Sequence, residues 1–218
     1  PIVLSEWNSG MPHRNVFTTV MNWTSYNDVT YQGKIYGQKD VEFLRFLHLP
    51  RMISPTILEI AANVGKTRHT PYEQILDNGW KIVNPSEVCP DLDSYRRYIE
   101  SSKGEWSIAK NAYVAGKTGW FSCRSACYLA AGKPVILQDT GFSSVLPTGK
   151  GLMPFTTIEE AVEAFHKVED NYDLHSKVAR EVAEEFFNSD RVLVDLIENA
   201  FAGKGETVCS EALMKDNS

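Results

Sequence analysis

The fold is decided by residues 116–142, which read GKTGWFSCRSACYLAAGKPVILQDTGF. A polar loop leads to Ser122, a residue type that caps helices, and the small apolar run 126–131 ends at Gly132, where a helix would stop. The short apolar run 134–137 then predicts a strand that is covered on both faces, as in a parallel sheet. The stretch therefore predicts a loop, a short helix and a buried strand.

The start of this predicted helix could bind an anion. Free backbone N–H groups and the positive end of the helix dipole lie there, and Arg124 in the first turn adds a forked donor that suits phosphate. The same pattern also fits a packing helix that carries a surface arginine. The residues alone leave both interpretations open.

Outward from this stretch, short apolar runs alternate with helical patterns. Further strands are predicted over residues 16–23, 56–62 and 80–83. Helices are predicted from Asp40, over residues 71–79 and 93–102, and in three C-terminal segments that begin near Thr157, Asp173 and Ser189. This alternation predicts an α/β fold, a Rossmann-like parallel sheet flanked by helices, with the C-terminal helices packed on it. Its central strand would be residues 135–138 or a neighbour.

Three segments carry more detailed expectations. The helix capped by Asp40 is expected to bury Val41, Leu44, Leu47 and Leu49 and to expose Glu42 and Arg45. Residues 107–114 are expected to form a short strand-like piece that leads into the central stretch. The last helix is expected to pack through an apolar face made of Val192, Leu193, Leu196 and Ile197.

The chain divides into three parts. Residues 1–16 have no hydrophobic period and indicate an N-terminal arm or interdomain linker, residues 17–204 form the Rossmann-like domain, and residues 205–218 form a flexible polar tail. The sequence begins at Pro1 and not at methionine, so it could be a fragment. Because ligands bind beyond the carboxyl ends of parallel strands, the loops to consider are 22–25, 63–69, 84–87 and 139–144.

The composition narrows the class of protein. A net charge of −6 argues against non-specific nucleic-acid binding, and the 218 residues contain no apolar run of membrane-spanning length. Four cysteines, at positions 89, 123, 127 and 209, form no C-x-x-C pair, which favours reduced thiols over zinc or a disulfide framework. No basic-then-apolar signal starts the chain. We expect a soluble cytoplasmic protein without a membrane span, a nucleic-acid partner or a bound metal.

The central stretch also resembles a known family. Ser-x-Arg at residues 122–124, the small-residue helix that ends Ala-x-Gly-x-Pro-Val-Ile, and the loop Asp139-Thr140-Gly141 are similar to the C-terminal half of GT-B glycosyltransferases. Bacterial group-1 and spore-maturation-type glycosyltransferase-like proteins resemble it most. The likeness extends from about Phe17 to Phe201.

The resemblance implies a donor-binding domain. In that family two such halves face each other across a cleft, the C-terminal half holds the nucleotide-sugar, and positive groups replace a metal in stabilising the departing diphosphate. No cofactor is expected, and the acceptor-binding N-terminal half would be missing from this chain, so the isolated chain is expected to be inactive. The positions carried over as donor- or phosphate-binding are Ser122, Arg124, Asp139, Thr140, Gly141, Lys39, Ser107 and Lys110.

One departure supports an alternative. The family helix carries a glutamate, three residues after the arginine, that binds the donor ribose, and Cys127 occupies that position here. A non-catalytic module that binds a nucleotide or a sugar phosphate, or a degenerate interaction domain, therefore stays open as the second interpretation. No histidine is placed by motif as a catalytic base, and no nucleophile is predicted.

Two other motifs were weighed. Residues 65–67, Gly-Lys-Thr, resemble the end of a phosphate-binding P-loop, but Ile60 stands where that motif needs its first glycine. The same loop could still bring Lys66 and Arg68 near a phosphate. Asp91-Leu92-Asp93 matches a metal-binding D-x-D, but it follows a proline and precedes a helix, where aspartate serves as a cap. The cap is the preferred interpretation.

Overall fold

The computed structural model describes residues 1–25, 27–62 and 70–202. Six parallel strands form one sheet in the order β5-β4-β1-β6-β7-β8. The strands are β1 (Val16–Met21), β4 (Ile57–Ala62), β5 (Lys81–Val83), β6 (Gly104–Ser107), β7 (Val135–Gln138) and β8 (Leu152–Phe155). Numbered along the chain within this sheet, the order is 3-2-1-4-5-6, the doubly wound Rossmann arrangement. The predicted fold class is confirmed, and β6, one of the two central strands, is the neighbour of β7.

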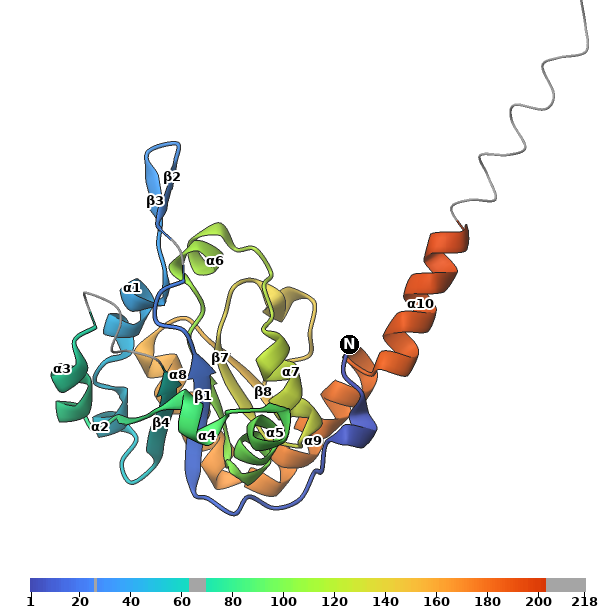
Figure 1. Cartoon of the computed structure of the whole chain (residues 1–218), viewed down its shortest axis with the longest axis horizontal. Helices are drawn as coiled ribbons and strands as arrows, with labels where there is room; N and C mark the ends of the chain where they lie inside the picture. Colours follow the sequence, from blue (N-terminus) through green and yellow to red (C-terminus); the bar gives the residue numbers. More distant parts are fainter. Residues whose placement is uncertain (26, 63–69, 203–218) are drawn as a thin grey trace, which may run out of the picture.

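Helices cover both faces of the sheet (Figure 1). One face carries α1 (Lys39–Phe43), α2 (Leu49–Met52), α3 (Tyr72–Asp77) and α8 (Ile158–Asp170), and the other carries α5 (Leu92–Ser101), α7 (Cys123–Ala130) and α9 (Tyr172–Phe186). Each face has its own hydrophobic core. Phe43, Trp106 and Phe165 belong to the first, and Tyr128, Val135 and Val182 to the second. The strand β7 is buried from both sides, which is why residues 135–137 form a continuous apolar run.

Smaller elements complete the domain. A hairpin of β2 (Val29–Tyr31) and β3 (Lys34–Tyr36) projects from the body, and α6 (Asn111–Gly116) lies at its base (Figure 1). The helix α4 (Pro85–Val88) follows β5, and 3₁₀ turns lie at Leu4–Glu6, Leu44–Phe46 and Phe142–Ser144. The N-terminal arm packs on the body, because Ile2 bridges to Asn188 and the Lys133 ammonium donates to the Gly10 carbonyl at 2.7 Å.

Several helix signals in the sequence are confirmed. Ser122 occupies the N-cap position of α7, and Gly132 has φ +64° just after the helix ends. Thr157 and Glu160 form a capping box at the start of α8. Asp91 caps α5 by accepting a hydrogen bond from the Ser94 amide at 2.7 Å, so the cap interpretation of the D-x-D motif holds.

Three expectations were wrong. The first turn of α1 is capped at Gln38, not Asp40, and the helix buries Glu42 while Val41 and Leu44 are exposed. The reason is that Glu42 accepts hydrogen bonds from Arg45, Asn111 and Gln138, so its burial is compensated.

The segment 107–114 is not a strand. β6 ends at Ser107, and the amides of Asn111 and Ala112 donate to the Gln38 and Gly37 carbonyls, which turns the chain into α6. The last helix, α10 (Ser189–Ala202), has no buried residue. Leu193, Leu196 and Ile197 are exposed, because this helix projects away from the sheet (Figure 1).

Candidate functional site

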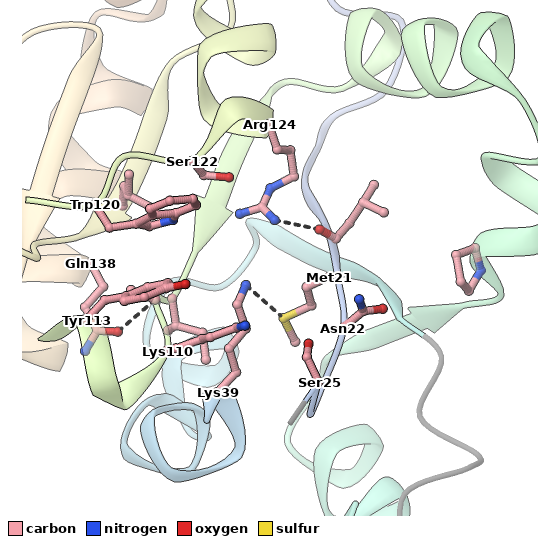
Figure 2. A pocket seen from close by; sticks show the side chains of 15 residues that line it. Met21, Asn22, Ser25, Lys39, Lys110, Tyr113, Trp120, Ser122, Arg124 and Gln138 are labelled. Atoms are coloured by element: carbon pink, nitrogen blue, oxygen red, sulfur yellow. Dashed lines mark hydrogen bonds between the residues drawn. The ribbon is translucent and has the colours of Figure 1, made fainter. Parts of the chain in front are cut away.

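A pocket of about 350 Å³ opens at the carboxyl edge of the sheet, beyond the ends of β1 and β6. The two strands are adjacent, but the chain leaves β1 toward β4 on one side and reaches β6 on the other. This is the switch point where doubly wound sheets bind ligands. The lining comes from strand ends, from α1 and α6, and from the loop before α7, and includes Met21, Gln138, Lys39, Tyr113, Trp120 and Arg124 (Figure 2).

Arg124 lies at one end of the pocket and is held by the protein itself. Its Nε donates to Glu105 Oε1 at 2.5 Å, one terminal nitrogen donates to the Val20 carbonyl at 2.7 Å, and the other donates to Ser107 Oγ at 2.6 Å. Burial works to lower the pKa of Arg124, but the charge and hydrogen bond of Glu105 outweigh it and raise that pKa. Three of five N–H groups are thus used, and the remaining two are those a ligand could take.

Lys39 is a pocket cation with little compensation among the described residues. Its Nζ donates only to the Met21 sulfur, at 3.9 Å, and within the described ranges no carboxylate forms an ion pair with it. Burial lowers the pKa of Lys39 well below its usual value, and the charges of Arg124 and Lys110 lower it further, while Glu105 opposes them. A buried ammonium without an anion is unfavourable, so this part of the pocket favours an anionic ligand.

A hydrogen-bond network fixes the helix α1, which carries Lys39. Glu42, one turn later on α1, accepts from the Gln138 side chain at 2.6 Å and from Asn111 at 2.8 Å. Gln138 in turn accepts from the Ala109 amide at 3.1 Å. These bonds join α1 to the ends of β6 and β7, so the backbone beneath Lys39 is set by the sheet itself.

Ser122 and Lys110 also line the pocket. Ser122 has an extended N-cap backbone, but its hydroxyl makes no cap hydrogen bond and lies beside Arg124 (Figure 2). Lys110 is the N-cap residue of α6, and its Nζ lies 5.8 Å from the ring centre of Tyr113. Lys39, Lys110 and Arg124 therefore bring three basic side chains from three separate elements to one cavity.

The other residues carried over from the resemblance do not line this pocket. Ser107 is fully buried beneath Arg124 and accepts its hydrogen bond. Asp139 folds back to accept from the Gly141 amide and the Ser143 hydroxyl. Thr140 is buried and donates to the Trp120 carbonyl at 2.7 Å, and Gly141, with φ +104°, turns the chain into the 3₁₀ segment. Lys66 and Arg68 lie outside the described residues.

Two aromatic residues of the pocket are not predicted from the sequence. Tyr113 and Trp120 line the pocket with ring centres 5.0 Å apart and planes inclined by 26°. Trp120 is 47% exposed, which is unusual for so large an apolar side chain. Their positions in a predicted strand and a glycine-containing loop gave no periodic signal, because they meet only when α6 packs against the loop before α7.

Among residues 1–25, 27–62 and 70–202, no group of three or more His, Cys, Asp or Glu side chains is arranged to hold a metal ion. In these ranges no helix has both the length and the apolar character needed to cross a bilayer.

The fold of this chain is similar to part of several solved structures, which are GT-B glycosyltransferases. The similar solved structures include the crystal structure of TarM (TM-score 0.60, 11% identity, 88% of this chain and 36% of that chain). Sucrose-phosphate synthase from Thermosynechococcus elongatus aligns with a TM-score of 0.56, 12% identity, 93% of this chain and 51% of that chain. The GtfA/B complex aligns with a TM-score of 0.54, 13% identity, 88% of this chain and 38% of that chain.

These matches concern the fold. The chain spans between about a third and a half of the length of the structures it matches. No protein-family model and no curated protein matches the sequence.

Proposed function

We propose that the pocket binds the diphosphate of a nucleotide-sugar, and that the chain is the donor-binding domain of a longer two-domain glycosyltransferase. The observation that carries this proposal is Lys39, a half-buried ammonium at the switch point that lacks a carboxylate partner among the described residues. Lys110 and Arg124 reach the same cavity from other elements. A diphosphate supplies the negative charge that this arrangement lacks.

The proposed chemistry is electrostatic. When a glycosyl group leaves a nucleoside diphosphate, negative charge develops on the departing phosphate, and fixed cations that face it lower the barrier. Lys39 would hold that charge directly, and Arg124 would contribute the two N–H groups that Glu105, Val20 and Ser107 leave unused. This assignment needs no metal ion, and it leaves the acceptor and its activating base to another domain.

The alternative of a non-catalytic nucleotide or sugar-phosphate module rests on Cys127. The glutamate that would bind the donor ribose is absent, and Cys127 does not line the pocket but lies partly buried near Tyr95. Burial raises the pKa of the Cys127 thiol to about 11, so at neutral pH the thiol stays protonated and cannot replace a carboxylate. If the pocket binds nucleotide, the ribose must be held elsewhere or only weakly.

The test is calorimetric titration of the 218-residue chain with pyrophosphate, UDP, GDP, UDP-glucose and GDP-mannose. We expect at least one nucleotide or nucleotide-sugar to bind, and Lys39→Met to weaken it by roughly 10- to 100-fold, because a charge-assisted contact is worth about 1.5–3 kcal/mol. Lys81→Met is the matched control, since Lys81 is exposed at the first residue of β5, at the opposite sheet edge. Failure of all five probes to bind would refute the proposal.

A further inference from the structure

The stacked pair Tyr113–Trp120 forms an aromatic wall on one side of the pocket. Met21, Asn22 and Ser25 lie on the other side, with the basic side chains between them (Figure 2). The rings are already stacked on each other, at 5.0 Å between centres. Trp120, which lines the pocket, nevertheless keeps 47% of its surface exposed. Exposing an indole to water is unfavourable, so the wall is a surface that a ligand ring would cover favourably.

The wall is held in place without a ligand. Thr140, in the loop after β7, donates its hydroxyl proton to the Trp120 carbonyl at 2.7 Å, and its backbone carbonyl accepts from the Gly119 amide at 2.9 Å. Gly141 follows with φ +104°, and a Cβ there would lie 3.4 Å from the Lys117 carbonyl. The loop after β7 is therefore packed directly against the segment that carries Trp120.

The wall adjoins the basic residues. Tyr113 lies one helical turn after Lys110, and Trp120 lies in the loop that leads through Ser122 into α7, the helix that carries Arg124. In a nucleotide-sugar, the sugar ring is bonded directly to a phosphate, whereas the ribose separates the base from the phosphates. A ring that rests on a wall adjoining the phosphate-binding side chains is thus better matched by the sugar than by the base.

We propose that Tyr113 and Trp120 select the donor by stacking on the apolar face of its sugar ring, and that Thr140 positions Trp120 for this contact. This inference rests on the proposed function, since it assigns the sugar of the same ligand. A pyranose presents C–H groups on one face, which pack on the electron-rich face of an aromatic ring. The opposite side of the pocket, with Asn22 and Ser25, is left for the nucleoside.

The experiment compares each nucleoside diphosphate with its sugar derivative. Dissociation constants for UDP, UDP-glucose, GDP and GDP-mannose are measured by calorimetry for the wild-type chain, Trp120→Ala and Tyr113→Ala. We expect Trp120→Ala to weaken a nucleotide-sugar about tenfold while changing the corresponding diphosphate less than about twofold. Tyr72→Ala is the control, because Tyr72 is a similarly exposed aromatic residue (45%) on α3, away from the pocket.

Thr140 is tested through the same ratio of the two dissociation constants. Thr140→Val removes the hydroxyl that holds the Trp120 carbonyl, and Thr140→Ser restores it. We expect Thr140→Val to raise the nucleotide-sugar to diphosphate ratio of dissociation constants and Thr140→Ser to return it to the wild-type value. General destabilisation would instead weaken both ligands equally, so the ratio separates a positioning role from a structural one.

Each outcome decides between the assignments. Equal weakening of diphosphate and nucleotide-sugar by Trp120→Ala would mean that the wall holds the base, and would overturn the inference while leaving the proposed function intact. An unchanged affinity for both ligands would also overturn it. If the wild-type chain binds none of the four ligands, the proposed function fails and this inference fails with it.

Discussion

Lys39 and Arg124 carry the same formal charge in one pocket, but their surroundings differ. Arg124 is paired with Glu105 and makes three protein hydrogen bonds, so removing it would take the ion-pair partner away from a buried carboxylate. Lys39 donates to a thioether and, among the described residues, has no carboxylate in an ion pair with it. The arginine is therefore partly structural, and the lysine is the pocket cation whose charge the described residues compensate less.

This difference predicts opposite effects of Lys39→Met on stability and binding. Removal of an uncompensated, half-buried cation should raise the free energy of unfolding of the ligand-free chain by about 1 kcal/mol, while diphosphate affinity falls. Thermal or urea unfolding measures the first effect and calorimetry the second. Lys81→Met should leave both within error. A clear loss of stability in Lys39→Met would mean that this ammonium is compensated after all.

The lowered pKa of Lys39 predicts proton uptake on binding. An anion beside the lysine raises its pKa, so the fraction of chains with a charged lysine increases when ligand binds. Affinity should accordingly fall as the pH rises. Titration of a nucleotide-sugar near pH 8, in buffers of different ionisation enthalpy, measures the uptake. The diphosphate of a nucleotide-sugar is esterified at both ends and does not titrate near pH 8, so the protein must take up the proton. Binding heats that do not depend on the buffer would contradict the prediction.

At the scale of elements, the N-terminal arm is tied to the body through Lys133. This side chain follows α7, is fully buried, and donates to the Gly10 carbonyl at 2.7 Å. Burial lowers its pKa from 10.5 to about 8, although Glu100 partly opposes the shift. The N-terminal arm thus contacts an ionisable group, the Lys133 ammonium. The sequence indicates the arm only as a segment without a hydrophobic period.

Lys133 predicts a particular dependence of stability on pH. Its folded-state pKa lies below its unfolded-state value, so between about pH 8 and 10.5 the unfolded chain binds more protons and the stability rises with pH. When the pH rises from 7.5 to 9.5, the free energy of unfolding of the wild type should increase by about 1–2 kcal/mol relative to that of Lys133→Met. Urea unfolding at the two pH values measures it, and parallel curves for the two proteins would contradict it.

At the scale of the whole molecule, the sheet could be predicted because both of its faces are covered. Strand β7 then appears in the sequence as the apolar run 135–137, and the caps at Ser122 and Thr157 mark where helices begin. The burial of Glu42 could not be predicted, because its three donors come from Arg45, Asn111 and Gln138, two of them far away in the chain. Local periodicity carries no information about such partners.

The residues of the site could likewise be predicted only in part. Ser122, Arg124, Lys110 and Lys39 line the pocket, but their assignment as donor-binding residues stays a prediction. Asp139 and Thr140 follow the right strand and yet turn away, because a turn and a loop carbonyl take their polar atoms. The aromatic wall depends on tertiary packing alone, and no local pattern indicates it.

The extent of the chain predicts binding without transfer. Efficient transfer needs an acceptor oriented against the donor, which can supply roughly 7–11 kcal/mol of barrier lowering, and the sheet described here accounts for one such domain. We expect the 218-residue chain to bind nucleotide-sugar and at most to hydrolyse it slowly. A coupled assay for released nucleoside diphosphate, with and without candidate sugar acceptors, measures this. Acceptor-dependent turnover by the isolated chain would refute the expectation.

The pairing of β1 with β6 has a consequence for how the chain folds. Phe17 pairs with Gly104, so the two strands that flank the pocket are separated by the whole of the β4 and β5 region. Loop closure over that length is slow, and during synthesis the pocket cannot exist until β6 and α7 have emerged. Whatever binds between these strands binds only the finished sheet. A ligand that contacts both strands would therefore slow unfolding, because it would hold together two strands that lie far apart in the chain.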